Sequence, residues 1–152
     1  MNAWQKSVED FHRVMQQPIG DTPIMRDVAL RYALIEEEMT ELLDALRAGD
    51  MVEAVDGMVD AIYVILGAAV AFGIDLDPFF VEVHRTNMAK AGGGQHSNGK
   101  IIKPPDWQPP RIAEMLDKLK HRCVTCSGKG RVHDGYMDWH DCSDCAGAGV
   151  RA

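Results

Sequence analysis

The sequence predicts an all-α protein, a bundle of four helices, with a small β-hairpin ribbon at the C-terminal end. Three observations lead to this prediction. Apolar residues recur at helical spacing as far as Ala91, residues 92–110 are rich in glycine and proline, and all four cysteines lie in the last 30 residues. We therefore expect a helical domain, a linker, a short helix and a four-cysteine ribbon, over residues 1–91, 92–110, 111–122 and 123–152 respectively.

Glycines, prolines and helix caps divide the helical domain. Gly49 ends a long acidic helix, and Asp50 with Glu53 forms the capping-box pattern that opens the next one. Asp77-Pro78 is a cap followed by a first-turn proline. The expected helices cover residues 3–17, 25–48, 51–72 and 77 to about 91.

Charge is distributed unevenly along the chain. The net charge is −7, but residues 1–90 carry 16 acidic side chains against 7 basic ones, whereas residues 91–152 carry 9 basic against 7 acidic. The first region is therefore not expected to grip nucleic acid, because phosphate contacts need a basic surface. Nucleic-acid binding by the ribbon is not expected either, although its mildly basic charge permits it.

The chain shows the features of a cytoplasmic protein. Its first ten residues are polar and lack the apolar segment of a signal peptide. The longest apolar run, residues 61–74, has 14 residues, short of the ~20 that a membrane span requires. Two close cysteine pairs suit a metal site in a reducing compartment better than a disulfide framework. We expect no membrane partner.

The middle of the second helix carries acidic side chains close to an apolar face. Glu37 and Glu41 are about 40° apart around the helix, in line with Leu30 and Leu34, and Glu38 lies about 100° further round, towards the broad apolar sector. A buried ionised carboxylate costs several kcal/mol unless a cation or a donor meets it. A divalent metal ion is the simplest partner; the alternative is a solvated acidic face at the edge of the bundle.

Asp56 and Asp60 lie one turn apart on the third helix. Asp60 is followed by residues 61–70, which are apolar almost all round, and a helix of that kind is buried. Asp60 would therefore stand at the mouth of a buried segment. The alternative is that Asp60 is simply the last polar residue at the solvent end.

The fourth helix ends in the basic segment 84–90. Its positive charge suits the negative pole of the helix dipole, and the local pattern favours this explanation. The same side chains could instead hold phosphate groups.

The cysteines form two Cys-x-x-Cys pairs separated by 15 residues, the spacing of a four-cysteine zinc site: Cys123, Cys126, Cys142 and Cys145. Each pair extends to Cys-x-x-Cys-x-Gly-x-Gly, whose glycines allow backbone N–H groups to approach the thiolates. Residues 131–139 predict a β-hairpin with an Asp-Gly turn. Four thiolates close the coordination shell, so one structural zinc ion is expected, with redox pairs or free thiols as the alternative. The repeat resembles the cysteine-rich module of DnaJ-type co-chaperones, which implies a zinc knuckle but not chaperone activity.

Three features of residues 1–91 carry a second resemblance. They are Glu37-Glu38-x-x-Glu41, an acidic pair on the next helix, and the ending Asn87-x-x-Lys90. Together they resemble the MazG-like, all-α nucleoside triphosphate pyrophosphohydrolases, which include phosphoribosyl-ATP pyrophosphohydrolase and the dimeric dUTPases. With the appended ribbon the chain looks particularly like phage-encoded members, which would act in the host cytoplasm.

The second acidic motif departs from the ExxD that is usual in this family. Glu53-Ala54-Val55-Asp56 fits it formally, but the apolar run that normally follows the aspartate begins only after Asp60. If Asp60 were the aspartate of the motif, the glutamate would have to stand at position 57, which is Gly57. Asp56 and Asp60 are therefore favoured as the working pair. Glu53, to which the capping box assigns a structural role, is kept as an alternative ligand.

The resemblance implies hydrolysis of a nucleoside triphosphate between its α- and β-phosphates, yielding a monophosphate and pyrophosphate. It implies one or two Mg²⁺ ions, replaceable by Mn²⁺, on the oxygen ligands Glu37, Glu38, Glu41, Asp56 and Asp60. Glu38 or Glu41 would orient or deprotonate the attacking water. The implied substrate-binding residues are Arg85, Asn87 and Lys90. The family also implies a homodimer or homotetramer with sites between subunits.

Two alternatives stay open. Within the enzymes, phosphoribosyl-ATP hydrolysis competes with cleaning of the nucleotide pool, which the ribbon and the single catalytic domain favour. Outside them, the chain would be a non-catalytic helical adaptor that binds partners through its ribbon. Five carboxylates on two consecutive helices argue against the adaptor.

Overall fold

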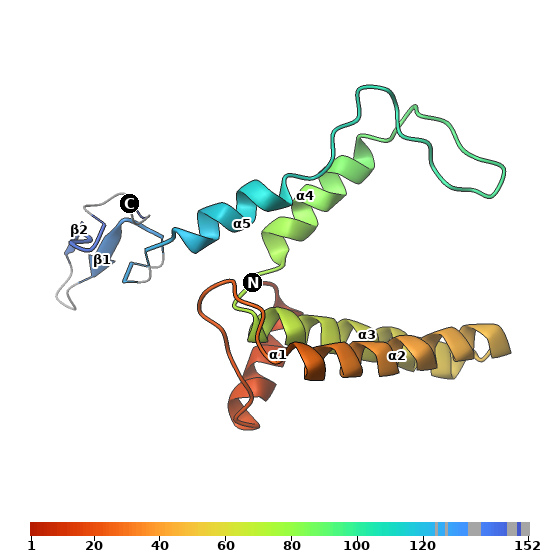
Figure 1. Cartoon of the computed structure of the whole chain (residues 1–152), viewed down its shortest axis with the longest axis horizontal. Coiled ribbons are helices and arrows are strands. Elements are labelled where there is room, and N and C mark those ends of the chain that lie inside the picture. Colours follow the sequence, from red (N-terminus) through yellow and green to blue (C-terminus); the bar gives the residue numbers. More distant parts are fainter. Residues whose placement is uncertain (124, 127, 134–137, 146–148, 150–152) are drawn as a thin grey trace. The chain divides into compact units, whose positions relative to one another are not determined.

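The computed structural model describes residues 1–123, 125–126, 128–133, 138–145 and 149. The helices are α1 (Ala3–Val14), α2 (Val28–Ala48), α3 (Met51–Ala71), α4 (Asp77–Met88) and α5 (Ile112–Lys120), and the strands are β1 (Arg131–His133) and β2 (Trp139–Asp141) (Figure 1). The predicted all-α class with a small sheet towards the C-terminus is confirmed. The chain divides into two compact units, Met1–Asp77 and Pro78–Ala152, and each is described by itself.

Two helix ends differ from the predicted bounds because the backbone turns left-handed there. The first helix stops at Val14, and Gln16 has a φ of 55°. The second helix starts at Val28, directly after Asp27 with a φ of 51°. Non-glycine residues adopt this conformation only locally and never as a continuing helix. The loop between α1 and α2 is therefore longer than the sequence pattern predicts.

In the first unit, α2 and α3 form an antiparallel pair, and α3 also packs against α1 (Figure 1). Gly49 has the left-handed φ of 70° that ends many helices, and the Asp50 carboxylate accepts hydrogen bonds from the N–H groups of Val52 and Glu53 at 3.0 and 3.2 Å. The reciprocal half of the capping box is absent, because the Asp50 N–H donates to the carbonyl of Ala45 at 3.0 Å. The side chain of Glu53 therefore does not cap the helix.

Small residues on α3 set the distance between α2 and α3. Ala54, Gly57 and Ala61 are buried at a spacing of three and four residues, which places them on one face. A Cβ atom on Gly57 would lie 3.0 Å from the Cα and 3.1 Å from the Cβ of Leu42 on α2. The backbone of α2 thus passes directly over Gly57 and leaves no room for a side chain.

Gly57→Leu is expected to lower the free energy of unfolding of the helical unit by about 3 kcal/mol, because overpacking forces the two backbones apart. Thermal and urea denaturation followed by circular dichroism measure this change. Met58→Leu, on the exposed side of the same helix, is the matched control and should stay within about 0.5 kcal/mol of the wild type. A Gly57→Leu protein as stable as the wild type would contradict the close approach.

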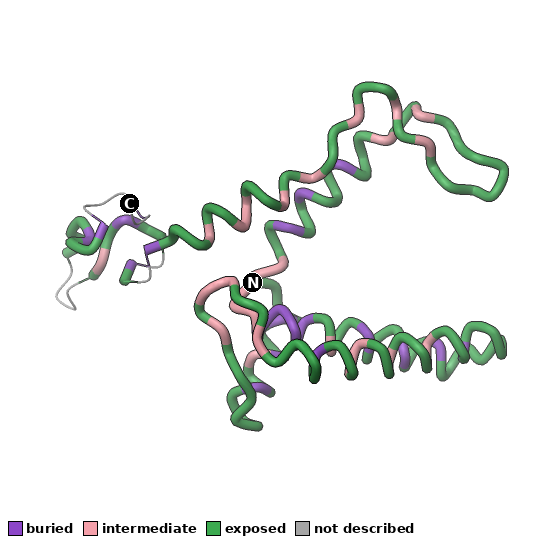
Figure 2. The backbone as a smooth tube through the Cα atoms, viewed as in Figure 1, coloured by how far each residue is buried: buried purple, intermediate pink, exposed green. Residues whose placement is uncertain are grey.

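The core of the first unit lies where α1 meets the second half of α3. Val8, Leu66 and Val70 form a buried cluster, with Leu76 packed against it. In Figure 2 the longest buried stretch of the first unit lies at one end of α3. Gln5 of α1 is fully buried and joins α1 to the segment after α3: its Nε2 donates to the carbonyl of Ile74 at 2.6 Å, and its Oε1 accepts from the N–H of Leu76 at 3.1 Å. The core therefore lies at one end of the α2–α3 pair.

The predicted burial of residues 61–70 holds only for part of that run. Residues 66–70 are buried, whereas Ile62, Tyr63 and Ile65 are about 40% exposed, because α1 covers this stretch of α3 only in part. The ring of Phe11 on α1 packs edge-on against Tyr63, with the ring centroids 5.8 Å apart. By length and composition α3 is the one described helix that could cross a membrane, and half of its most apolar window is buried in the structure. With packing partners on two sides, α3 is the central helix of its unit.

In the second unit, β1 and β2 pair antiparallel, with Arg131 opposite Asp141 and His133 opposite Trp139. The predicted hairpin is thus present, while its Asp-Gly turn lies outside the described residues. The predicted linker, residues 92–110, contains an isolated antiparallel bridge between Gln95 and Ile101. This segment folds back on itself before it reaches α5.

Candidate active site and metal centre

The five predicted magnesium ligands lie in the first unit, three in the middle of α2 and two in the first half of α3. Glu38 is partly buried, and the other four are exposed: Glu37, Glu41, Asp56 and Asp60. These four carboxylates thus have the exposure of the solvated acidic face that the sequence analysis left open as an alternative. The reason is that the α2–α3 pair leaves this part of its surface uncovered within the described first unit.

Glu38 is the centre of this acidic group. The pKa of its carboxyl is raised above its usual value, first by burial and then by the negative charges of Asp60, Glu41, Glu37 and Asp56, in that order. Charges act in this way only over short distances. The packing of α2 on α3 thus brings the other four predicted residues within electrostatic range of Glu38, and Asp60 of the opposite helix has the strongest effect among these four charges.

The carboxylates form an open site. Among the described residues, only the four cysteines form a group of three or more metal-binding side chains whose ligand atoms lie within 4.8 Å of one another. Mg²⁺ is commonly held by one or two carboxylates, with waters and substrate phosphates completing its shell. A set of exposed, mutually repelling carboxylates on two helices fits that mode of binding, because a divalent cation relieves the repulsion.

The structure bears on the choice between Glu53 and Asp56 as the residue that acts beside Asp60. An ExxD motif with Asp60 as its aspartate would require a glutamate in place of Gly57. The backbone of α2 leaves no room for a side chain at that position. Glu53 is exposed, and its carboxylate has no hydrogen bond to any described residue. An ExxD motif that ends at Asp60 therefore does not fit the packing of α2 on α3. Asp56 and Asp60 stay the predicted pair, with Glu53 as the alternative ligand.

Arg31 is a buried charged residue that the sequence analysis did not select. Its side chain is 5% exposed, and its Nε and Nη2 atoms have no hydrogen-bond partner among the described residues. A Cβ on Gly67 would lie 3.6 Å from its Nη1 and 3.3 Å from Nε2 of His12. Arg31 precedes Glu38 by seven residues, so both lie on one face of α2, about 10 Å apart along the axis. The spacing of seven residues between Arg31 and Glu38 is the sequence signal that could have identified Arg31.

The predicted substrate-binding residues lie in the second unit, at the end of α4. Asn87 and Lys90 line an open hollow of about 590 Å³, and Lys90 Nζ donates to Asn87 Oδ1 at 2.6 Å. Arg85 donates from Nε and Nη2 to the buried carboxylate of Glu82, both at 2.8 Å. These bonds from Arg85, together with the N–H of Arg111, lower the pKa of Glu82 to about 2. Arg85 is thus anchored, whereas Asn87 and Lys90 face the hollow.

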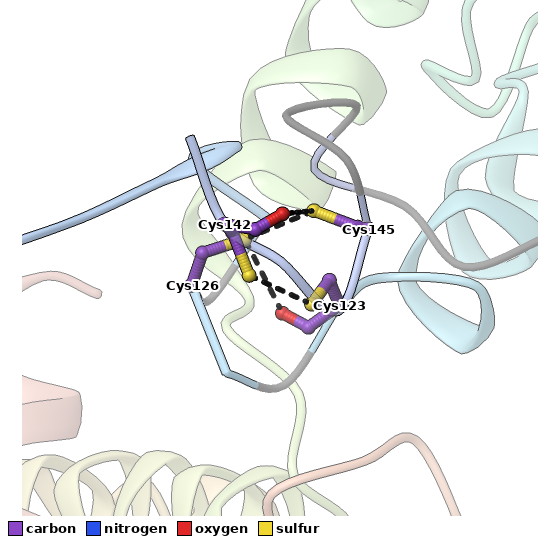
Figure 3. Close-up of side chains that lie close together, drawn as sticks. All are labelled: Cys123, Cys126, Cys142 and Cys145. Atoms are coloured by element: carbon purple, nitrogen blue, oxygen red, sulfur yellow. Dashed lines mark hydrogen bonds between the residues drawn. The ribbon is translucent and has the colours of Figure 1, made fainter. Parts of the chain in front are cut away.

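The four predicted zinc ligands converge in the ribbon (Figure 3). The Sγ atoms of Cys123 and Cys142 are 3.8 Å apart, and those of Cys126 and Cys145 are 3.7 Å apart. Zinc–sulfur bonds of about 2.3 Å in a tetrahedron place the sulfurs about 3.8 Å from one another. The spacing therefore fits a ZnS₄ site and is far too long for disulfides.

Backbone N–H groups support the thiolates as predicted. The N–H of Gly130 donates to Cys126 Sγ and that of Gly149 to Cys145 Sγ, each at 3.2 Å. The N–H of Cys126 contributes most to lowering the pKa of Cys123 to about 6, while burial raises the pKa of Cys142 to about 12. A thiol whose pKa is raised by burial keeps its proton at neutral pH unless a cation replaces that proton, which is what zinc does.

Comparison with known proteins identifies the family of the helical part of the chain. The model of the family described as phosphoribosyl-ATP pyrophosphohydrolase matches residues 8–87, more than half of the chain. The chain belongs to this family, which lies in the MazG-like superfamily that its motifs resemble. The matched region contains all the predicted magnesium ligands together with Arg85 and Asn87. Membership supports a nucleotide pyrophosphohydrolase, a hydrolase that acts on acid anhydrides.

The chain is also similar to an uncharacterized protein of Acanthamoeba polyphaga mimivirus. The two are 44% identical over 50 residues, which make up 33% of this chain and 20% of the viral protein. The aligned part of the chain thus spans about a fifth of that relative.

Proposed function

We propose that the chain is a Mg²⁺-dependent nucleoside triphosphate pyrophosphohydrolase that converts a nucleoside or deoxynucleoside triphosphate to its monophosphate and pyrophosphate. The observation that carries this proposal is the partly buried Glu38, with four further carboxylates from α2 and α3 acting on it. These residues lie inside the region that the family model matches. A site of this kind suits a substrate that brings its own negative charge and needs a cation to approach.

The carboxylates would hold the metal from two helices. A bound Mg²⁺ or Mn²⁺, as one or two ions, would neutralise phosphate charge and acidify a coordinated water. The ligands from α2 would be Glu37, Glu38 and Glu41. Those from α3 would be Asp56 and Asp60, and Glu53 could bind the metal as a further ligand beside Asp56. Because four of these side chains are exposed, solvent water can complete the coordination shell.

Glu38 or Glu41 would assist the attacking water. The pKa of Glu38 is raised towards neutral pH, and a carboxylate with a higher pKa is a better proton acceptor. Its carboxylate would take a proton as the water oxygen bonds to the α-phosphorus. The bond between that phosphorus and the bridging oxygen then breaks, and pyrophosphate leaves with the electron pair.

Residues of α4 would neutralise the charge of the phosphates. Lys90 and Asn87 already lie together at the open hollow and offer an ammonium group and an amide. Arg85 keeps its Nη1 outside the pair of bonds to Glu82, so it can add a further donor while remaining anchored.

The active form would be a homodimer or homotetramer. An apolar hollow of about 250 Å³ lies between α1 and α3, and its lining includes Trp4, Val59, Ile62 and Tyr63. Trp4 is 67% exposed. Apolar surface of this kind commonly marks a protein interface. Light scattering coupled to size-exclusion chromatography measures the mass, and a monomer at assay concentration would refute this part.

Pyrophosphate release from a panel of ribo- and deoxyribonucleoside triphosphates, with and without Mg²⁺, tests the proposed function. We expect Mg²⁺-dependent release from at least one of them. Phosphoribosyl-ATP belongs in the panel because the matching family model is described by that substrate. Release from phosphoribosyl-ATP alone would replace the proposed substrate, and release from none would favour the helical adaptor.

A further inference from the structure

The end of α4 and the segment that follows it are basic. From Val83 to Pro105 the chain has four arginine or lysine residues and no acidic one. The positive charge is therefore not neutralised within the segment itself. The dipole at the end of α4 accounts for the charge near Lys90, but not for Lys103, which lies fifteen residues beyond the helix.

Trp107 fixes this segment against α4. Its indole N–H donates to the carbonyl of Thr86 at 2.7 Å, and further along the backbone N–H of Arg111 donates to Glu82 at 3.0 Å. Both Thr86 and Glu82 are buried. Buried hydrogen bonds of this type hold their partners in a defined geometry. The segment is thus attached to the helix at two points.

Two lysines meet at the indole ring. Lys103 Nζ lies 3.9 Å from the ring centroid of Trp107, and Lys90 Nζ lies 5.9 Å from it. Cation–π attraction holds each ammonium group near the ring. Two like charges held at one ring also repel each other. An anion that contacts both would relieve the repulsion. The ring thus positions a pair of cations, here called the lysine pair.

A glycine turn holds the backbone next to the lysine pair. A Cβ on Gly93 would lie 1.9 Å from the carbonyl oxygen of Ile102, so only glycine permits this approach. The N–H of Ile102 also donates to the carbonyl of Gly94 at 3.1 Å. Because Lys103 directly follows Ile102, this contact also fixes the backbone position of Lys103. Lys90 itself lines the hollow of about 590 Å³, together with residues of the glycine turn.

We infer that Lys90 and Lys103, positioned by Trp107, form a binding site for a polyphosphate anion, the pyrophosphate group of a nucleotide or free pyrophosphate. Two ammonium groups on one ring suit two adjacent phosphates better than a single one. A nucleic-acid base cannot stack on the face of the indole that Lys103 occupies. The assignment to substrate or product rests on the proposed function, whereas the binding of the anion does not.

Calorimetric titration of inorganic pyrophosphate into the full-length protein, without added divalent metal, tests the site. Lys103→Ala should weaken binding about tenfold, as expected for the loss of one charge-assisted contact. Lys103→Arg should restore most of the affinity. Lys118→Ala on α5 makes the same change of charge in the same unit, outside the hollow, and should leave binding unchanged. Equal affinities in the wild type and Lys103→Ala would overturn the proposal.

Further titrations distinguish the sources of the anion. An α,β-methylene nucleoside triphosphate that loses affinity in Lys103→Ala, alongside pyrophosphate, identifies the site with the triphosphate of the substrate. Loss for pyrophosphate alone identifies a product site. Loss for a single-stranded oligonucleotide alone would overturn the polyphosphate assignment in favour of nucleic acid. Pyrophosphate binding that persists in a protein without any hydrolytic activity would refute the proposed function and not this site.

Discussion

Asp60→Asn is expected to reduce the rate of pyrophosphate release by a factor of about a thousand, with the fold intact. The substitution keeps the size of the side chain but removes the charge that acts most strongly on Glu38 from the opposite helix. Metal-assisted phosphoryl chemistry depends on the ligands that place the ion, and losses of this size are typical when a catalytic group is removed. Glu41→Gln should have a similar effect, because it removes a carboxylate from the same group.

Steady-state kinetics across a series of Mg²⁺ concentrations measure this prediction. Loss of a metal ligand should raise the Mg²⁺ concentration needed for half-maximal rate, as well as lowering kcat. Glu36→Gln is the matched control on α2: its carboxylate accepts a hydrogen bond from Tyr32 at 2.7 Å and lies about 160° round the helix from Glu38. It should retain activity within about twofold. Full activity in Asp60→Asn would remove α3 from the catalytic site.

Removal of zinc is expected to unfold the ribbon and to leave the helical unit folded. Structural zinc sites bind with about 10–16 kcal/mol in small domains, more than a ribbon with two three-residue strands can obtain from its own packing. Cys126→Ser removes one ligand and the acceptor of the N–H···S bond from Gly130. We expect one zinc ion per chain in the wild type and loss of ribbon signals in the NMR spectrum of the variant.

The helical circular-dichroism signal serves as the internal control for zinc removal. All four ligands lie between Cys123 and Cys145, and the three packed helices end at Ala71, so that signal should change little. Ser143→Ala, an exposed neighbour of Cys142, should keep both zinc and the NMR spectrum of the ribbon. A wild-type protein that contains no zinc and shows four free thiols would contradict the metal centre.

The features that the sequence predicts well are those with local causes. Gly49 and Asp50 mark the turn between α2 and α3 because one residue tolerates a left-handed backbone and the other caps the next helix. The cysteine pairs predict their own convergence, because a tetrahedral metal site requires four ligands and a hairpin between them. Periodicity likewise placed all five carboxylates on two helices that do pack together.

The features that could not be predicted depend on contacts between distant segments. The hydrogen bond from Trp107 to Thr86 joins a glycine- and proline-rich stretch to a helix that ends nineteen residues earlier, and no local pattern indicates it. The exposure of Asp60 follows from where α1 crosses α3, since α1 contacts Tyr63, Leu66 and Val70, which all lie further along α3. The role of Gly57 required the position of Leu42.

The identity of the products tests the central claim most directly. Phosphorus NMR of a reaction with a nucleoside triphosphate and Mg²⁺, followed to completion, separates the two cleavage positions. The carboxylate site around Glu38 predicts nucleoside monophosphate and pyrophosphate in equal amounts, with both absent in Asp60→Asn. Nucleoside diphosphate with orthophosphate would contradict attack at the α-phosphorus, even if the reaction required Mg²⁺.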